Sequence, residues 1–210
     1  MNFIFKKVAV YSTFLLVYIG YPSSGLAKSI CVFCSSKDSI EQAYKPIAYN
    51  LGKKLANNNF GLVTGGRDSG LMKEVINGHA SIKSSAPRYA IIPKSLEKHN
   101  VLHGSITKSN IIWTEDLHDR LRIFYTKCDA IVVMPGGFGA MQELMDSIEN
   151  NKFGTIKKPV YILNTDHFWD PTLEQFKNMV AADALQESDL NYFTVVTSVD
   201  GLMKQLKTLQ

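Results

Sequence analysis

Short, continuous apolar runs alternate with amphipathic segments along this chain, and this alternation limits its fold more than any other feature. The apolar runs lie within SICVFCSS, NFGLVTGG, YAIIPKSL, NIIWTED, DAIVVMPGG and KPVYILNT. Runs that are apolar throughout predict strands buried on both faces, and helices between consecutive strands predict parallel pairing. The sequence therefore predicts a doubly wound, Rossmann-like α/β fold. We expect a mostly parallel sheet with helices on both faces and ligands at the carboxyl ends of its strands.

The amphipathic segments are expected to form the covering helices. Residues 40–58 carry apolar side chains at helical spacing, namely Ala43, Ile47, Leu51 and Leu55. Further helices are expected over residues 71–82 and 117–128. Another is expected directly after Gly139, and a last helix is expected to begin at Pro171. We expect residues 28–210 to form a single domain, because the length suits one domain with a substantial core.

The first 27 residues differ in composition from the rest of the chain. MNFIFKK is followed by an uncharged apolar stretch, VAVYSTFLLVYIGY, and then by PSSGLA with small residues at Gly25 and Ala27. This order is typical of a secretory signal peptide over residues 1–27, cleaved after Ala27. The apolar stretch is shorter than the roughly 20 residues that span a bilayer, although an uncleaved anchor is an alternative. We expect an exported protein, periplasmic or secreted, without stable membrane association after cleavage; a cytoplasmic location is the alternative.

Charge and cysteine content exclude some classes of partner and site. The formal net charge of +4 comes from scattered lysines, so we expect no nucleic-acid partner. Cys31 and Cys34 are three residues apart on a predicted strand and face opposite sides, which disfavours a bridge between them. We expect these two residues and Cys128 to be free cysteines of the core. The histidines show no paired metal-ligand spacing, so no metal site is expected.

Two glycine turns stand where predicted strands end and helices begin. They are TGGRDSG at residues 64–70 and PGGFGA at residues 135–140. Glycine lets an anion approach the backbone closely, and the free N–H groups of a helix start favour phosphate. Neither turn has the GxGxxG or Walker pattern, and a tight structural turn is the alternative for each.

Glu143 and Arg120 are the charged candidates beside these turns. Glu143 follows Gly139 by four residues, so it is expected beside any phosphate held at the second turn. The alternative is that Glu143 only complements the helix dipole, which is the reading we favour for Asp146. Arg120 lies early in a predicted helix, where its charge opposes the dipole and calls for a partner or a functional use. On spacing alone, a solvated salt bridge is the interpretation we favour for Arg120, and a functional use is the alternative.

Five ordered motifs resemble the Lonely guy (LOG) family of phosphoribohydrolases, over about residues 29–180. The family pattern PGGxGTxxE corresponds to residues 135–143, and its GGGxxGLM segment to Gly65-Gly66 with Gly70-Leu71-Met72. Its ICVFCGSS corresponds to residues 30–36, its IPK to residues 92–94, and its MHxRK to residues 117–121. The chain departs from the family at Ala140, where threonine is usual, and at Leu121, where lysine is usual. The segment HGSITKSN offers no counterpart of a substrate-contacting glutamate.

The resemblance implies hydrolysis of the N-glycosidic bond of nucleoside 5′-monophosphates, such as AMP or cytokinin riboside phosphates. It implies that Arg120 and Glu143 are catalytic, and that no metal or organic cofactor is required. The phosphate is then held by Gly136, Gly137, Phe138, Gly139 and Ala140, and other substrate contacts come from Gly65, Gly66, Met141 and Gln142. It also implies a homodimer. A nucleotide-binding module that has lost efficient chemistry is the alternative, because three motif positions depart from the family.

Overall fold

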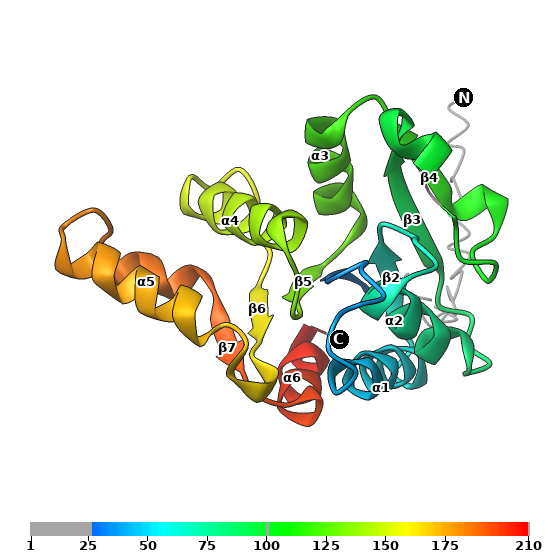
Figure 1. Cartoon of the computed structure of the whole chain (residues 1–210), viewed down its shortest axis with the longest axis horizontal. Helices are drawn as coiled ribbons and strands as arrows, with labels where there is room; N and C mark the ends of the chain where they lie inside the picture. Colours follow the sequence, from blue (N-terminus) through cyan, green and yellow to red (C-terminus); the bar gives the residue numbers. More distant parts are fainter. Residues whose placement is uncertain (1–26, 100, 210) are drawn as a thin grey trace, which may run out of the picture.

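The computed structural model describes residues 27–99 and 101–209 (Figure 1). A seven-stranded sheet forms its centre, with the order β4-β3-β2-β1-β5-β6-β7 and parallel pairing throughout. The strands are β1 (Ser29–Phe33), β2 (Gly61–Thr64), β3 (Arg88–Pro93), β4 (Ile111–Thr114), β5 (Ala130–Val133), β6 (Val160–Leu163) and β7 (Thr194–Val196). The helices are α1 (Tyr44–Asn57), α2 (Gly70–Ala80), α3 (Leu117–Lys127), α4 (Phe138–Lys152), α5 (Asp170–Ala181) and α6 (Val199–Leu206).

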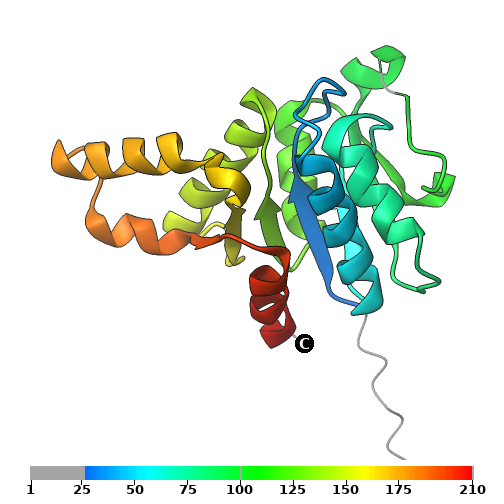
Figure 2. The same ribbon diagram turned by 60° about the horizontal axis from the view of Figure 1, so that its bottom comes forward.

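Alternate side chains of each central strand point to opposite layers of helices. In β1, Ile30 and Val32 join the apolar cluster formed with α1, α2 and α6, whereas Cys31 and Phe33 join the cluster formed with α3 and α4. Both faces are buried because a strand turns successive side chains to opposite sides. The arrangement confirms the predicted doubly wound, Rossmann-like class. α5 projects beyond the sheet edge, as both ribbon views show (Figures 1 and 2).

Two predictions about the helices were wrong. The first helix begins at Tyr44 rather than at residue 40, because Asp38 accepts a hydrogen bond from the Gly70 amide (2.8 Å) and the Ile40 amide bonds back to Lys37 in a turn (3.2 Å). The helix near Pro171 is not the last element, since β7 and α6 follow it. β7 is a three-residue, half-exposed edge strand, so its sequence lacks the long apolar run that marks the central strands.

The expectation of three free cysteines was wrong for two of them. Cys31 and Cys128 form a disulfide with a Cα–Cα distance of 5.5 Å, and Cys34 is the free cysteine among the described residues. The pairing joins positions 97 residues apart, which no local spacing indicates. Cys31 and Cys34 do lie on opposite faces of the sheet, as their spacing predicted.

The predicted signal peptide falls on residues 1–27, and all of it except Ala27 lies outside the described residues. Within residues 27–99 and 101–209, no helix combines the length and the hydropathy that crossing a bilayer would need.

Candidate active site

The strand order reverses between β1 and β5, which places the ends of these two strands at the centre of the carboxyl edge. β1 pairs with β2 on one side and with β5 on the other, so the loops that follow β1 and β5 leave toward opposite helix layers. The loops are joined by a hydrogen bond from the Ser35 amide to the Pro135 carbonyl (3.0 Å). In open α/β sheets this switch point is where ligands bind.

The glycine turn at residues 135–140 leads directly into α4 at this switch point. Gly137 is the N-cap of α4, and among the described residues no side chain caps this helix start and no acid lies in its first turn. A side chain built at Gly137 or Gly139 would meet no described atom within 4 Å, so the space in front of the turn is open. Phe138 is almost fully exposed and Ala140 is buried. The first amides of α4 therefore have no side-chain cap, at a helix start where an anion is favoured.

The turn at residues 64–70 differs, because its helix start is already occupied. The Gly70 amide donates to the Asp38 carboxylate (2.8 Å), and the Leu71 amide donates to the Ser35 carbonyl (2.9 Å). The expectation of free, outward-pointing N–H groups at both helix starts was therefore wrong for α2. Gly66 has a left-handed backbone (φ 72°), and a side chain there would meet the Ala90 side chain at 2.4 Å. The conformation of the turn therefore requires glycine at position 66.

Arg120 and Glu143 meet beside the open turn. The Arg120 Nη1 atom lies 3.4 Å from the Glu143 Oε1 atom, and only 17% and 11% of the two side chains are exposed. The pair is buried, so the solvated salt-bridge reading of Arg120 does not describe it. Glu143 is the partner that compensates the positive charge of Arg120 near the start of its helix.

Two further contacts hold Arg120 in place. Its Nε donates to the Ile91 carbonyl at the end of β3 (3.0 Å), and its guanidinium lies 4.9 Å from the Phe124 ring centroid. A side chain on Gly65 would meet the Arg120 Nη2 atom at 2.5 Å. The absence of a side chain at Gly65 thus makes room for the guanidinium.

Burial dominates the electrostatics of Glu143. It raises the pKa of Glu143 to about 7, and the Arg120 guanidinium opposes this rise. A carboxyl group with a pKa near neutrality can accept or donate a proton at physiological pH, which suits a general acid or base. Burial, with the Glu143 carboxylate, also raises the pKa of the nearby Cys34 thiol. Cys34 therefore stays protonated and is unsuited to nucleophilic chemistry.

A cavity of about 100 Å³ adjoins Arg120. Its lining combines the Arg120 side chain and Gly65 with residues that sequence analysis had not selected, namely Ser36, Arg67, Met72, Ile91, Pro93 and Leu96. Ser36 and Arg67 also border a neighbouring hollow of about 390 Å³. Ser36, Met72 and Pro93 belong to motifs that carry the family resemblance. Ile91 and Leu96 had no such signal, because only the pairing of β3 beside β2 brings them to the cavity.

Met141 and Gln142 border other parts of the structure than the cavity beside Arg120. Met141 packs against the apolar cluster under α3 and α4, and Gln142 borders a groove of about 490 Å³ beside α5. Successive helical residues point about 100° apart, which explains why neighbours of Glu143 face other surroundings. Their predicted substrate contacts stay predictions.

Asp146 and Arg122 make structural contacts. Asp146 accepts hydrogen bonds from the Tyr125 hydroxyl (2.5 Å) and from the Asn150 amide (3.0 Å). Arg122 is exposed and pairs with Asp119 on its own helix. Leu121 is buried in the core, so neither it nor Arg122 supplies the cation that the family motif has at this point.

Within the described ranges, no three His, Cys, Asp or Glu side chains come together where a metal ion could be held.

Fold and site together define a doubly wound α/β domain with an open glycine turn and a buried carboxylate–arginine pair at its switch point. Residues 72–206 match the family model described as "Possible lysine decarboxylase". The chain belongs to this family, the LOG family.

Plant members of the family are similar over most of the chain. The cytokinin riboside 5′-monophosphate phosphoribohydrolase LOG of Oryza sativa subsp. japonica is 33% identical over 77% of this chain and 65% of its own length. LOG2 of Arabidopsis thaliana, which carries the same activity name, is 34% identical over 70% of this chain and 67% of its own length. LOG1 of the same plant is 28% identical over 86% of this chain and 83% of its own length.

Solved structures share the fold at lower identity. The molybdenum cofactor binding protein of Rippkaea orientalis aligns with a TM-score of 0.68 at 22% identity, over 89% of this chain and 99% of its own. The molybdenum cofactor carrier protein of Chlamydomonas reinhardtii aligns with a TM-score of 0.64 at 22% identity, over 87% and 98%. These likenesses concern the fold alone.

Proposed function

We propose that this protein hydrolyses the N-glycosidic bond of nucleoside 5′-monophosphates to free base and ribose 5-phosphate. The observation that carries the proposal is the buried Arg120–Glu143 pair beside the uncapped glycine start of α4. The activity printed for the plant relatives supports the same reaction class. AMP and cytokinin riboside 5′-monophosphates are the candidate substrates.

The open turn supplies the site for the 5′-phosphate. Backbone amides at Gly137, Phe138 and Gly139 are available to an anion, because the helix start carries no side-chain cap. Ala140 is buried and has no hydroxyl to add a further bond. The phosphate therefore rests on backbone donors and the helix dipole, whose interaction with an anion is worth roughly 0.3–1 kcal/mol at exposed sites and up to about 2 when partly buried.

Glu143 then faces the ribose and assists cleavage of the N-glycosidic bond. As the bond from the anomeric carbon to the base nitrogen breaks, its electron pair leaves with the base and positive charge develops on the sugar. The Glu143 carboxylate stabilises this charge and takes a proton from the attacking water, whose oxygen bonds to the anomeric carbon. The departing base gains a proton, so that water is divided between the two products.

Arg120 supports the carboxylate. Without the guanidinium, burial alone would favour the neutral acid still more strongly, since Arg120 lowers the pKa of Glu143. Arg120 also borders the small cavity, where its remaining N–H groups can face the leaving base. Arg120 thus keeps the buried Glu143 carboxyl group partly ionised at neutral pH.

The direct test is incubation of the mature chain, residues 28–210, with AMP and with isopentenyladenosine monophosphate. Release of adenine or of isopentenyladenine, with equal ribose 5-phosphate, is the expected result. Binding of AMP without release of base would instead support a nucleotide-binding module. The departures at Ala140 and Leu121 are what favour that second reading.

Export of the protein is a further proposal. The composition of residues 1–27 motivates it, and the Cys31–Cys128 disulfide supports it, because such bonds persist in oxidising compartments. The mature chain is expected to begin at Lys28. Intact mass of protein from its native host tests this: a retained start, together with recovery in the cytoplasmic fraction, would refute export.

A further inference from the structure

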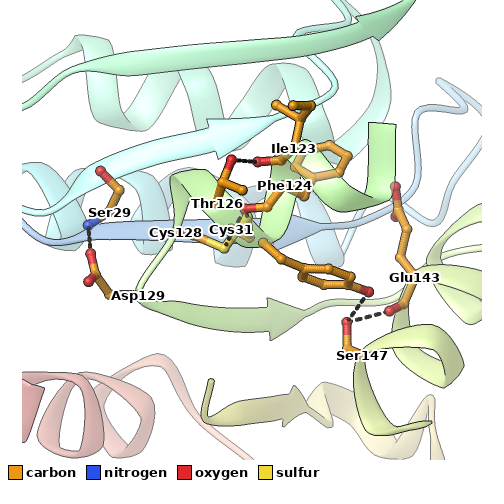
Figure 3. Close-up of a disulfide and its surroundings, with 10 residues drawn as sticks. Ser29, Cys31, Ile123, Phe124, Thr126, Cys128, Asp129, Glu143 and Ser147 are labelled. Atoms are coloured by element: carbon orange, nitrogen blue, oxygen red, sulfur yellow. Dashed lines mark hydrogen bonds between the residues drawn. A yellow bond between two sulfur atoms is a disulfide. The ribbon is translucent and has the colours of Figure 1, made fainter. Parts of the chain in front are cut away.

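The disulfide joins the central strand to the end of the helix that carries Arg120. Cys31 lies in β1, and Cys128 is the C-cap of α3. Both residues are almost completely buried. Figure 3 shows the bridge between the Ser29–Asp129 hydrogen bond on one side and Glu143 on the other. The carboxyl-terminal end of α3 is thus fixed to the strand that ends at the switch point.

α3 also packs directly on β1, β3 and β4. Three of its eleven residues are buried, namely Leu121, Phe124 and Tyr125. Its outer face carries exposed charged side chains such as Arg122 and Lys127. The disulfide adds a covalent anchor at the carboxyl-terminal end of α3 to this packing.

Phe124 connects the bridge to Arg120. The Phe124 ring meets the Phe33 ring of β1 edge to face, with centroids 5.0 Å apart, and lies 4.9 Å from the Arg120 guanidinium carbon. Arg120 is eight residues before Cys128, or roughly 12 Å along a helix. A small shift of the helix end is therefore carried to the guanidinium.

We propose that the Cys31–Cys128 disulfide is a positioning element of the active site, which holds α3 so that Arg120 stays paired with Glu143. The proposal rests on the proposed function for its kinetic consequence, but its structural consequence does not depend on turnover. Cys31 and Cys128 are positioning residues that act through Arg120. Reduction by a dithiol converts that reagent to its own disulfide, and each cysteine gains one electron and one proton.

Peptide mapping without reductant comes first, and it must recover Cys31 and Cys128 in one linked pair of peptides. The variant Cys31→Ala/Cys128→Ala is then compared with wild type. We expect kcat for AMP to fall about tenfold with a smaller change in KM, because displacement of a catalytic group by a fraction of an ångström weakens turnover. Three free thiols in wild type, or an unchanged kcat in the variant, would overturn the proposal.

The second measurement is the titration of the Glu143 carboxyl group by NMR. Arg120 lowers the pKa of Glu143, so a displaced Arg120 must raise it. Glu143 itself acts on the titratable groups of Cys34 and Tyr125, and burial raises the pKa of both, which leaves them uncharged near neutral pH. An unchanged Glu143 pKa in the variant would contradict the proposal even if the wild type releases no base.

Leu51→Ala is the matched control for lost stability. Leu51 is buried in α1 against the opposite face of the sheet. We expect it to lower the melting temperature while kcat and the Glu143 pKa stay at wild-type values. If the alanine pair does not fold, wild type reduced with dithiothreitol is titrated in its place, and the same two outcomes decide.

Discussion

The Arg120 guanidinium and the Glu143 carboxylate form a largely buried ion pair between α3 and α4, with 3.4 Å between the Nη1 and Oε1 atoms. Burying a charged pair rarely stabilises a fold, because desolvation offsets most of the attraction. Here the raised pKa of Glu143 shows that burial outweighs its partner. A buried carboxyl group with a raised pKa, at the switch point of the sheet, is better explained by chemistry than by stability.

Glu143→Gln should abolish most turnover while leaving the fold and nucleotide binding in place. The amide has the same shape but neither stabilises developing positive charge nor accepts a proton. The expected loss in kcat is on the order of 10²–10³-fold. Kinetics with AMP and a binding measurement on the same preparation check this.

Asp146→Asn is the matched control for that change. Asp146 lies one turn further along α4 and bonds to Tyr125 and Asn150. Its amide variant should lose some thermal stability and keep its turnover. Wild-type rates in Glu143→Gln would refute the mechanism.

Arg120→Ala should lower turnover and weaken nucleotide binding moderately. Removing the guanidinium raises the pKa of Glu143 above about 7, so the acid limb of the pH–kcat profile should move to higher pH. Arg122→Ala, on the exposed face of the same helix, should leave rate and profile unchanged. An Arg120 variant whose profile stays in place would show that the two residues do not act together.

Gly65→Ala should disturb Arg120 without disturbing the backbone. The added methyl group would approach the Arg120 Nη2 atom to 2.5 Å, so the side chain must move. We expect turnover to fall by roughly 10- to 100-fold, since small misplacements are costly at a reacting centre. Gly104→Ala, at an open position, is the control, and equal rates in both variants would count against the role of Gly65.

Stability should depend on pH through Glu143. Its pKa is raised from 4.5 to about 7 in the folded state, so the native protein keeps a proton that the unfolded chain has lost. Relative to Glu143→Gln, the stability contribution is fully present below pH 4.5 and is lost as pH rises through 7. This rise in the pKa of Glu143 from 4.5 to about 7 corresponds to a loss of about 3 kcal/mol. Denaturant unfolding of both proteins at pH 4.5 and pH 8 measures it; a constant difference would exclude the raised pKa.

The protein should assemble as a homodimer, as the family resemblance implies. The groove beside α4 presents apolar side chains of Met145, Ile148, Phe176, Met179 and Phe193, which a second copy would cover. Light scattering at micromolar concentration should give twice the mass of the chain. A monomer would remove this proposal, and Met179→Glu should weaken the dimer by placing a charge in the groove.

The sequence by itself determined the class of fold and the nature of the turn at residues 135–140. Periodicity and glycine content are local properties, so the alternation of buried runs with amphipathic segments was enough to predict the parallel sheet and its two helix layers. The place of Glu143 behind the turn also follows from local spacing, because the residue at which a helix begins determines which residues lie close to its start.

Tertiary structure decided which distant residues meet. The pairing of Arg120 with Glu143, and of Cys31 with Cys128, depends on strand order and on the face that α3 turns to the sheet. Asp38 occupies the start of α2, which made one of two similar glycine turns unsuitable for an anion. These contacts join segments that are far apart in the chain, and a pattern of period two or 3.6 carries no information about them.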